Sequence, residues 1–259
     1  MKLVLLTNKG SLLGKQVLDA LNAHQIEIKA VVMIKQPLRY HWRLFRSVQK
    51  RIGLYDACYF SVKRILETII NNRKTPINEN QIKQTHPATP VFFTHGTNSE
   101  GTRNLLKSLC PDICILGQTG VVSKEILEIP KKGTLNVHPG ILPAYRGIDC
   151  AKWAILNGEF DKVGGTVHWV NRGIDTGPIL AKRVYPFKGD ETIETLNQSL
   201  YSLCVSMLIQ CLSILQSGTI PPEESQSLQE GKQYYKMPKR LEKMTRMKLE
   251  EFLLQTKVQ

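Results

Sequence analysis

Short apolar runs alternate with segments of helical periodicity from the start of the chain to His138. The helical segments at residues 12–23 and 100–109 lie between runs that have the length and composition of buried strands. These strand-like runs are Leu3–Leu6, Ile28–Ile34, Val91–Thr94, Ile113–Leu116 and Gly133–His138. Strands that alternate with helices predict an α/β fold: a doubly wound, mostly parallel sheet with helices on both faces.

The chain is long enough for one large α/β domain with an appendage. We expect residues 1–220 to form this domain and residues 221–259 to form a basic C-terminal extension. A basic helical insert at residues 36–75 interrupts the alternation, with Gly53 as a break between its two halves. One interpretation is a helical hairpin that covers an edge of the sheet. The other is a substrate lid or a surface for an anionic partner.

The insert carries nine basic residues against two acidic ones, with six aromatic residues interleaved. The basic residues are Arg39, Arg43, Arg46, Lys50, Arg51, Lys63, Arg64, Arg73 and Lys74. The whole chain has a formal net charge of +13, which indicates an acidic partner such as a nucleotide, a polyglutamylated cofactor, tRNA or an anionic membrane face.

Composition points to a cytoplasmic protein without a metal site. The apolar run Leu3–Leu6 is too short for a secretory signal, and the six cysteines show no zinc-like spacing. Residues 195–222 lack charged side chains, but polar ones recur there every three or four positions. This stripe predicts a soluble helix and no membrane span.

Two glycines near the first turn, Gly10 and Gly14, match neither dinucleotide nor Walker spacing, because Gln16 stands where Ser or Thr is needed. A tight turn into a helix is the plainer interpretation. The start of a helix at Gly10 and Ser11 is nevertheless a candidate site for an anionic group of a substrate.

A polar pair lies at the end of the fifth strand. Side chains alternate along a strand, so Asn136 and His138 share one face, and Pro139 and Gly140 then end the strand. Polar groups on a buried strand are costly unless they are paired or used. In parallel sheets ligands bind at this edge, which makes the pair a candidate for catalysis.

A second polar segment runs from a strand at Gly164–Val170 into a glycine-rich loop that contains Asp175. An Asx-type turn is the plain role for Asp175. His168 lies inside the strand, and we favour a structural role for it. Between the two segments, Tyr145 and Arg146 are candidates for binding the substrate, although Arg146 is equally well explained as a surface residue.

Together these segments resemble the folate-dependent formyltransferases, a family that includes glycinamide ribonucleotide transformylase, methionyl-tRNA formyltransferase and sugar N-formyltransferases. The matching pattern is Asn-x-His-Pro-Gly-x-Leu-Pro-x-Tyr-Arg-Gly from residue 136, Gly-x-Thr-x-His from residue 164 and Asp-Thr-Gly-Pro-Ile from residue 175. The resemblance spans about residues 91 to 182 and does not cover the insert.

The resemblance implies a catalytic triad of Asn136, His138 and Asp175 and a formyl donor, 10-formyltetrahydrofolate. It also implies that the loop after the fourth strand holds the pterin ring through backbone groups and that a second turn closes the pocket. The loop residues are Gln118, Thr119, Gly120, Val121 and Val122, and those of the turn are Arg172, Gly173, Ile174 and Asp175.

The sequence departs from the family pattern at several points. Gly140 replaces a common Ser, and Cys150 replaces a common Pro. The Gly-Ser-Asn phosphate loop of the glycinamide enzymes is broken, because Leu12 follows Ser11. The residues after about 220 leave no room for the long C-terminal barrel of tRNA formyltransferases. These departures argue against a glycinamide ribonucleotide or tRNA acceptor.

We therefore expect an N-formyltransferase of one-carbon metabolism that acts on a small, phosphorylated amine, with a nucleotide-linked amino sugar favoured. Asn136 would donate to the developing oxyanion, a protonated His138 would assist, and Asp175 would accept the proton of the amine. The alternatives are a methionyl-tRNA or glycinamide ribonucleotide formyltransferase, a 10-formyltetrahydrofolate hydrolase, and a non-catalytic folate- or anion-binding module. The aromatic insert is a candidate homodimer surface.

Overall fold

The structure is a computed structural model that describes residues 1–71, 82–83 and 86–256. Its chain divides into two compact units, Met1–Asn136 and Val137–Gln259. This division falls inside the segment that the sequence treats as one α/β domain, and residues 221–259 belong to the second unit.

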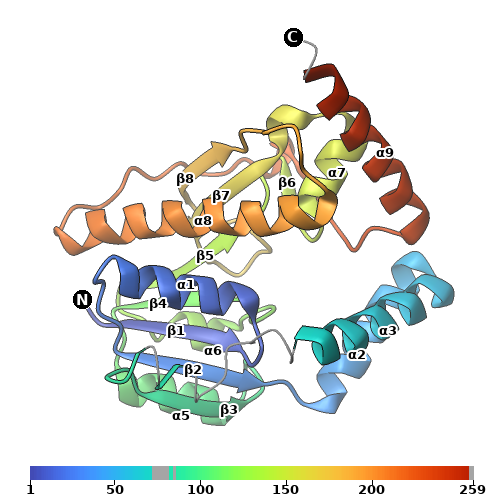
Figure 1. Cartoon of the computed structure of the whole chain (residues 1–259). Helices are drawn as coiled ribbons and strands as arrows, with labels where there is room; N and C mark the ends of the chain where they lie inside the picture. The colour runs from blue at the N-terminus through green and yellow to red at the C-terminus, as the bar shows by residue number, and fades with distance from the viewer. Residues whose placement is uncertain (72–81, 84–85, 257–259) are drawn as a thin grey trace. The chain divides into compact units, whose positions relative to one another are not determined.

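The first unit is built on a parallel sheet in the order β3-β2-β1-β4-β5. In Figure 1, α1 lies on one face of this sheet and α5 on the other. The strands are β1 (Leu3–Asn8), β2 (Ala30–Lys35), β3 (Val91–His95), β4 (Ile113–Gly117) and β5 (Gly133–His138), and the flanking helices are α1 (Leu12–Ala23), α5 (Glu100–Leu109) and α6 (Lys124–Leu127). The mostly parallel sheet with helices on both faces confirms the predicted fold class.

The centre of this sheet is shielded from solvent because both of its faces are covered. Leu3–Leu6 of β1 and Ala30–Met33 of β2 are 0% exposed. Continuous apolar runs of this kind are typical of parallel strands that are buried on both sides. In β1 and β2 the polar side chains come at the carboxyl end, at Thr7, Asn8 and Lys35.

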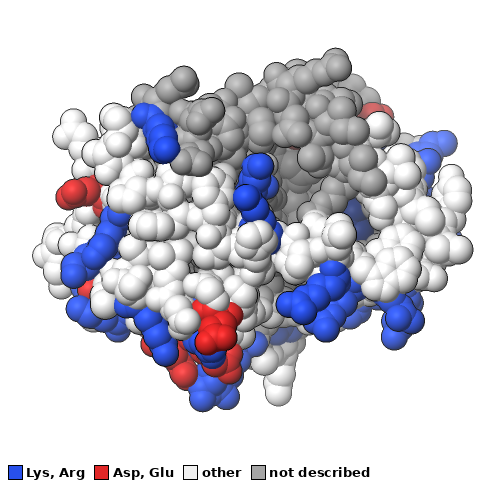
Figure 2. All heavy atoms as spheres, turned by 90° about the horizontal axis from the view of Figure 1, so that it is seen from below, with Lys and Arg blue, Asp and Glu red and all other residues white. Residues whose placement is uncertain are grey.

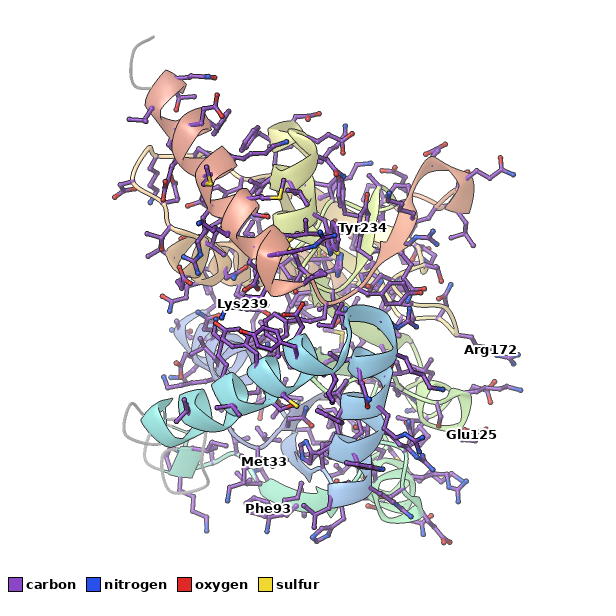
Figure 3. The ribbon with its side chains drawn as sticks, turned by 90° about the vertical axis from the view of Figure 1, so that its right-hand side faces the viewer. Met33, Phe93, Glu125, Arg172, Tyr234 and Lys239 are labelled. Carbon is purple, nitrogen blue, oxygen red and sulfur yellow. The ribbon has the colours of Figure 1, made fainter. Side chains whose placement is uncertain are left out.

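The insert contains two helices, α2 (Leu38–Ile52) and α3 (Leu54–Asn71), which pack against each other (Figures 1 and 3). Gly53, with φ of 88°, separates them as expected. The last residues of the predicted insert, 72–75, lie outside the described part of the chain. No residue of α2 is fully buried, and its basic side chains are exposed. Lys and Arg outnumber Asp and Glu on the face shown in Figure 2.

The second unit combines an antiparallel pair, β7 (Gly164–Trp169) and β8 (Ile179–Val184), with a parallel pair, β6 (Tyr145–Gly147) and β9 (Lys232–Tyr234). Its remaining elements are α7 (Cys150–Asn157), η1 (Phe160–Lys162), α8 (Ile193–Gln216), η2 (Leu228–Glu230) and α9 (Lys239–Thr256). The C-terminal residues thus add a strand beside β6 and a helix beside α7.

A buried group of charges fastens α9 to α7. Lys152 Nζ lies 2.5 Å from Glu242 Oε1 and 3.6 Å from Asp149 Oδ1. Lys236 Nζ lies 3.0 Å from Asp149 Oδ2. Removing one member would leave a buried charge without its partner, which is strongly destabilising. The basic C-terminal segment is therefore part of the packed second unit.

Helix α8 packs along β7 and β8 (Figure 1). A Cβ added at Gly165 of β7 would lie 2.4 Å from Cys204 Sγ of α8, so this close approach requires glycine. By length and composition α8 is, among the described residues, one helix that could cross a membrane. Half of its most apolar window is buried within the structure.

Candidate active site

Strand β5 carries two of the three predicted catalytic side chains. Asn136 and His138 are two residues apart, and the alternation of a strand places them on one face. Asn136 is half-buried and pairs in the parallel register with Leu116, one residue before the end of β4. His138 is the last residue of the strand and is 3% exposed.

His138 lies beside Asp175, the third predicted catalytic residue. Its Nδ1 is 3.4 Å from Asp175 Oδ2, and its Nε2 is 2.8 Å from the carbonyl oxygen of Tyr145. Because a carbonyl oxygen can only accept, Nε2 must carry a hydrogen and donate it. The other ring nitrogen, Nδ1, therefore faces the carboxylate: it donates to Asp175 when the ring is protonated and can accept a proton when the ring is neutral.

A second imidazole faces Asp175 in the same way. His168 Nδ1 donates to the carbonyl oxygen of Trp169 at 2.7 Å, and its Nε2 lies 3.6 Å from Asp175 Oδ1. His168 is 1% exposed, in keeping with the structural role favoured from the sequence, but its contact with Asp175 was not foreseen. The Gly-x-Thr-x-His pattern did indicate that His168 faces inward, because strand alternation directs His168 and the buried Thr166 to the same side.

Asp175 is held in place by the backbone as well. Its Oδ2 accepts the backbone N–H of Gly147 at 2.9 Å, and Gln226 Nε2 donates to its carbonyl oxygen at 3.1 Å. The side-chain bonds of the turn come from Asn171, whose Oδ1 accepts from Gly173 N at 3.0 Å. The sequence allowed Asp175 to be an Asx-type turn residue. In the structure Asn171 makes that turn contact, and the carboxylate of Asp175 faces the two histidines.

The electrostatics of this group follow from burial and pairing. Burial raises the pKa of Asp175, but His138, His168 and the Gly147 N–H outweigh it and lower the pKa to about 2. Burial lowers the pKa of His138, although Asp175 and the Tyr145 carbonyl act in the opposite direction. The site therefore holds an ionised carboxylate between two imidazoles, each of which uses its other ring nitrogen to contact a backbone carbonyl. It can take up one proton and share it.

The remaining turn residues are more open. Arg172 and Gly173 are exposed, and Ile174 is 40% exposed. In Figure 3 the side chain of Arg172 points away into solvent. Within the second unit, Asp175 is thus the residue of the turn that joins the two histidines, and the side chain of Arg172 lies outside this group. The predicted role of the turn in closing a pocket stays a prediction.

The predicted donor loop, Gln118–Val122, follows β4 in the first unit. Gln118 and Gly120 have φ of 62° and 81°, so the loop is sharply turned. Several of its carbonyl oxygens accept side-chain hydrogen bonds: Asn8 Nδ2 donates to that of Gln118, and Asn98 Nδ2 donates to that of Val121 at 3.0 Å. The loop is therefore held by Asn8, which ends β1, and by Asn98, which follows β3.

Gly10 and Ser11 lie in the turn before α1. Ser11 is its N-cap: the hydroxyl accepts the N–H of Gly14 at 2.9 Å and donates to Gln118 Oε1 at 2.9 Å. Ser11 is 5% exposed. These contacts match the tight-turn interpretation. The anion-binding role of Gly10 and Ser11 stays a prediction.

Tyr145 and Arg146 use their side chains within the protein. Tyr145 is 1% exposed, stacks on Tyr234 at 4.8 Å between ring centroids and donates its hydroxyl to Glu159. Arg146 Nη2 donates to the carbonyl oxygen of Gly231 at 3.1 Å, while its Nε is buried without a hydrogen-bond partner among the described residues. Their predicted contact with a substrate stays a prediction.

The two departures from the family pattern, Gly140 and Cys150, are neighbours in space. A Cβ added at Gly140 would lie 2.8 Å from Cys150 Cβ and 2.7 Å from His138 Nε2. The same Cβ would be 3.0 Å from the Tyr145 carbonyl that fixes the His138 ring. With this packing, a serine at position 140 requires a shift of His138 or of the start of α7.

We therefore expect Gly140→Ser to destabilise the protein by about 1–3 kcal/mol, as overpacking in a filled core does. The measurement is thermal and denaturant unfolding. Gly101→Ser is the matched control, because a Cβ there would meet nothing closer than 3.9 Å. Equal unfolding midpoints for the two variants would mean that the surroundings of Gly140 adapt freely.

The lowered pKa of His138 predicts a pH dependence of stability. Because the unfolded histidine, with a pKa of about 6.5, binds a proton before the folded one, stability is full above that pH and is lost as the pH falls below it. We expect the unfolding midpoint to drop as the pH falls below about 6.5 and the slope to flatten in His138→Gln. The exposed His24→Gln variant should keep the wild-type slope; a slope unchanged by His138→Gln would contradict the assignment.

No group of three or more His, Cys, Asp or Glu side chains in the described ranges could hold a metal ion.

Comparison with known proteins places this site in a family. A model described as formyl transferase matches residues 1–212. A methionyl-tRNA formyltransferase of Thermodesulfovibrio yellowstonii is 38% identical over 120 residues, which are 46% of this chain and 38% of that protein. The chain spans between about two fifths and a half of the length of the curated relatives it matches.

Solved structures show the same fold. Glycinamide ribonucleotide transformylase 1 of Symbiobacterium toebii has a TM-score of 0.58 at 17% identity, with 88% of this chain and 94% of that chain covered. An N-formyltransferase of Helicobacter canadensis in complex with folinic acid and dTDP-3-aminofucose has a TM-score of 0.58 at 14% identity, with 96% and 81% covered. Because the family model covers most of its residues, this chain belongs to the formyl transferase family.

Proposed function

We propose that this protein is an N-formyltransferase that moves a formyl group from 10-formyltetrahydrofolate to the amino group of a small anionic acceptor. The observation that carries the proposal is the pairing of Asp175 with His138 and His168 at 3.4 and 3.6 Å. A carboxylate flanked by two imidazole nitrogens suits a reaction in which an amine loses a proton. The unpaired cysteines fit a reducing cytoplasm, the proposed location.

The residues of the donor loop fit a flat, polar ring. Gly120 has a positive φ, which disfavours any side chain, and a Cβ there would lie 2.9 Å from Tyr40 Oη, so the Tyr40 hydroxyl would have to shift. Its neighbours are held by side chains of adjacent strand ends. Gln118–Val122 would hold the pterin through backbone groups, and the bound donor supplies the formyl group.

The triad would divide the work of the transfer. Asn136 would donate its amide N–H to the formyl oxygen as that oxygen gains negative charge. Asp175 would accept the proton of the attacking amine, and His138 would share that proton at Nδ1. The lowered pKa of His138 fits this role, because a neutral ring is available to accept the proton.

A nucleotide-linked amino sugar is the acceptor we favour. The hydroxyl of Ser11, where a phosphate loop would need a free donor, is committed to the N-cap of α1 and to Gln118. The exposed basic side chains of α2, with Trp42 beside them, suit a diphosphate joined to a base. The N-formyltransferase of Helicobacter canadensis, solved in complex with dTDP-3-aminofucose, agrees with this choice.

Methionyl-tRNA is the second candidate acceptor. It is favoured by the names of the curated relatives and by the same basic helix, which would also suit a nucleic-acid backbone. The deciding experiment incubates the protein with 10-formyltetrahydrofolate and amino-sugar nucleotides, glycinamide ribonucleotide or methionyl-tRNA and identifies formylated products by mass. Formate release without any formylated amine would identify a hydrolase and overturn the proposal.

Replacing Asn136 with Ala should lower kcat by about 10²–10³ because an oxyanion donor is lost, while the affinity for the donor stays nearly unchanged. Asp175→Asn should be at least as harmful, since an amide cannot accept the proton. Steady-state kinetics and calorimetry separate the two effects. Activity within a few-fold of wild type in either variant would remove that residue from the mechanism.

Substitutions in the donor loop should separate backbone from side-chain contacts. Gly120→Val should weaken donor binding strongly, because its φ of 81° and the nearby Tyr40 hydroxyl both oppose a branched side chain. Thr119→Ala should change the affinity little, since the Thr119 hydroxyl contacts only the adjacent carbonyl at 3.3 Å. Calorimetry with folinic acid measures both; unchanged binding by Gly120→Val would place the pterin elsewhere.

The basic face of α2 should attract the anionic acceptor. Changing Arg39, Arg43, Arg46 and Lys50 together to Gln should raise KM for the acceptor and leave kcat nearly unchanged, with a penalty that shrinks as salt rises. Kinetics at low and high ionic strength measure this. If the variant keeps its kinetics but loses self-association, measured by ultracentrifugation, α2 is a packing or dimer element instead.

A further inference from the structure

Gln36 joins three strand ends of the first unit. It follows β2 directly, and its Nε2 lies 2.9 Å from Asn8 Oδ1 at the end of β1. The same nitrogen lies 2.8 Å from Thr97 Oγ1, just beyond β3, and 3.3 Å from the carbonyl oxygen of Thr119 in the donor loop. A half-buried amide with all these partners is a hub rather than a surface side chain.

The hydrogen bonds around this hub have a fixed direction. Thr97 Oγ1 donates its one hydrogen to the Thr119 carbonyl at 2.8 Å, so it must accept from Gln36. Thr97 is 5% exposed, and hydrogen bonds in such a place gain strength from the low local dielectric. The relay from Gln36 through Thr97 to Thr119 therefore needs an amide at position 36 and a hydroxyl at position 97.

The insert helix begins beside this relay. Tyr40 follows Gln36 by four residues and lies in the first turn of α2. A Cβ added at Gly120 would lie 2.9 Å from the Tyr40 hydroxyl oxygen. The same short segment thus fixes the donor loop through Gln36 and bounds it through Tyr40. In the first unit, the start of α2 is part of the surroundings of the donor loop.

We propose that Gln36 and Thr97 are positioning residues for the formyl donor, and that Tyr40 makes the start of α2 a wall of its site. The proposal rests on the proposed function, which assigns the donor to the loop Gln118–Val122. By holding the Thr119 carbonyl, the relay sets the backbone of the loop on which the pterin would lie. Neither Gln36 nor Thr97 contacts reacting atoms in this scheme.

The chain offers a matched control for Thr97. Thr94, three residues earlier and 6% exposed, is also buried, but its Oγ1 has no hydrogen-bond partner among the described residues. Replacing either threonine with Val keeps the shape and removes a hydroxyl. Only the change at Thr97 breaks the relay.

The test measures the Kd of folinic acid by calorimetry, the unfolding midpoint without ligand, and kcat and KM. Thr97→Val and, at the other end of the relay, Gln36→Met should each raise Kd about tenfold and raise KM for the donor alike, as the loss of a buried hydrogen bond predicts. We expect kcat at saturating donor and KM for the acceptor to stay within about threefold. Thr97→Ser, which keeps the hydroxyl, should restore binding, and Thr94→Val should match wild type.

Two results would overturn the inference. One is wild-type folinic acid binding by both Thr97→Val and Gln36→Met. The other is equal losses in unfolding midpoint, kcat and donor KM, which would identify a structural role. If one of these variants does not fold, the other decides. A wild-type protein that binds no folinic acid would instead refute the proposed function, so the two failures are distinguishable.

The wall formed by Tyr40 is tested separately. Gly120→Ala should raise the Kd of folinic acid in the wild-type background and raise it by a smaller factor in Tyr40→Ala, because the clash with the hydroxyl is gone. Equal factors in the two backgrounds would mean that Tyr40 does not bound the loop and would overturn this part of the inference.

Discussion

An ionised carboxylate at Asp175 is the constraint around which the second unit is arranged. Its side chain is only 15% exposed, so it needs nearby donors or charges to remain ionised. The Gly147 N–H, His138 and His168 supply them, and each comes from a different strand. Two of these groups are themselves fixed by carbonyl oxygens, which orients the ring nitrogens toward the carboxylate.

The same constraint gives the C-terminal residues a role. Gly147, which donates to Asp175, ends β6, and β6 pairs with β9 in the parallel register. A Cβ at Gly147 would lie 2.1 Å from the Tyr234 carbonyl, so the two strands approach as closely as backbone allows. The buried charges between α7 and α9 also fasten the C-terminal residues to the second unit. The extension thus supports the strand whose Gly147 N–H holds Asp175.

In the first unit the corresponding constraint is the parallel register, which brings strand ends to one edge. Polar residues that follow separate strands, Asn8, Gln36 and Thr97, meet there and bind the loop after β4. Each is unremarkable in the sequence, because short polar residues are common after strands. Their function as a group depends on strand order, which places β1 between β2 and β4.

Sequence alone determined the alternating strands and helices of the first unit and the catalytic candidates, because the chain carries apolar periodicity and a dense local motif. The helices 12–23 and 100–109 and the strand Gly133–His138 match the structure residue for residue. Tertiary structure decided the rest. The contact of His168 with Asp175, the burial of Tyr145 and the hub at Gln36 each join residues far apart in sequence, and a three-residue strand such as β6 or β9 has no periodicity to detect. Such contacts depend on strand order and packing, which local patterns do not encode.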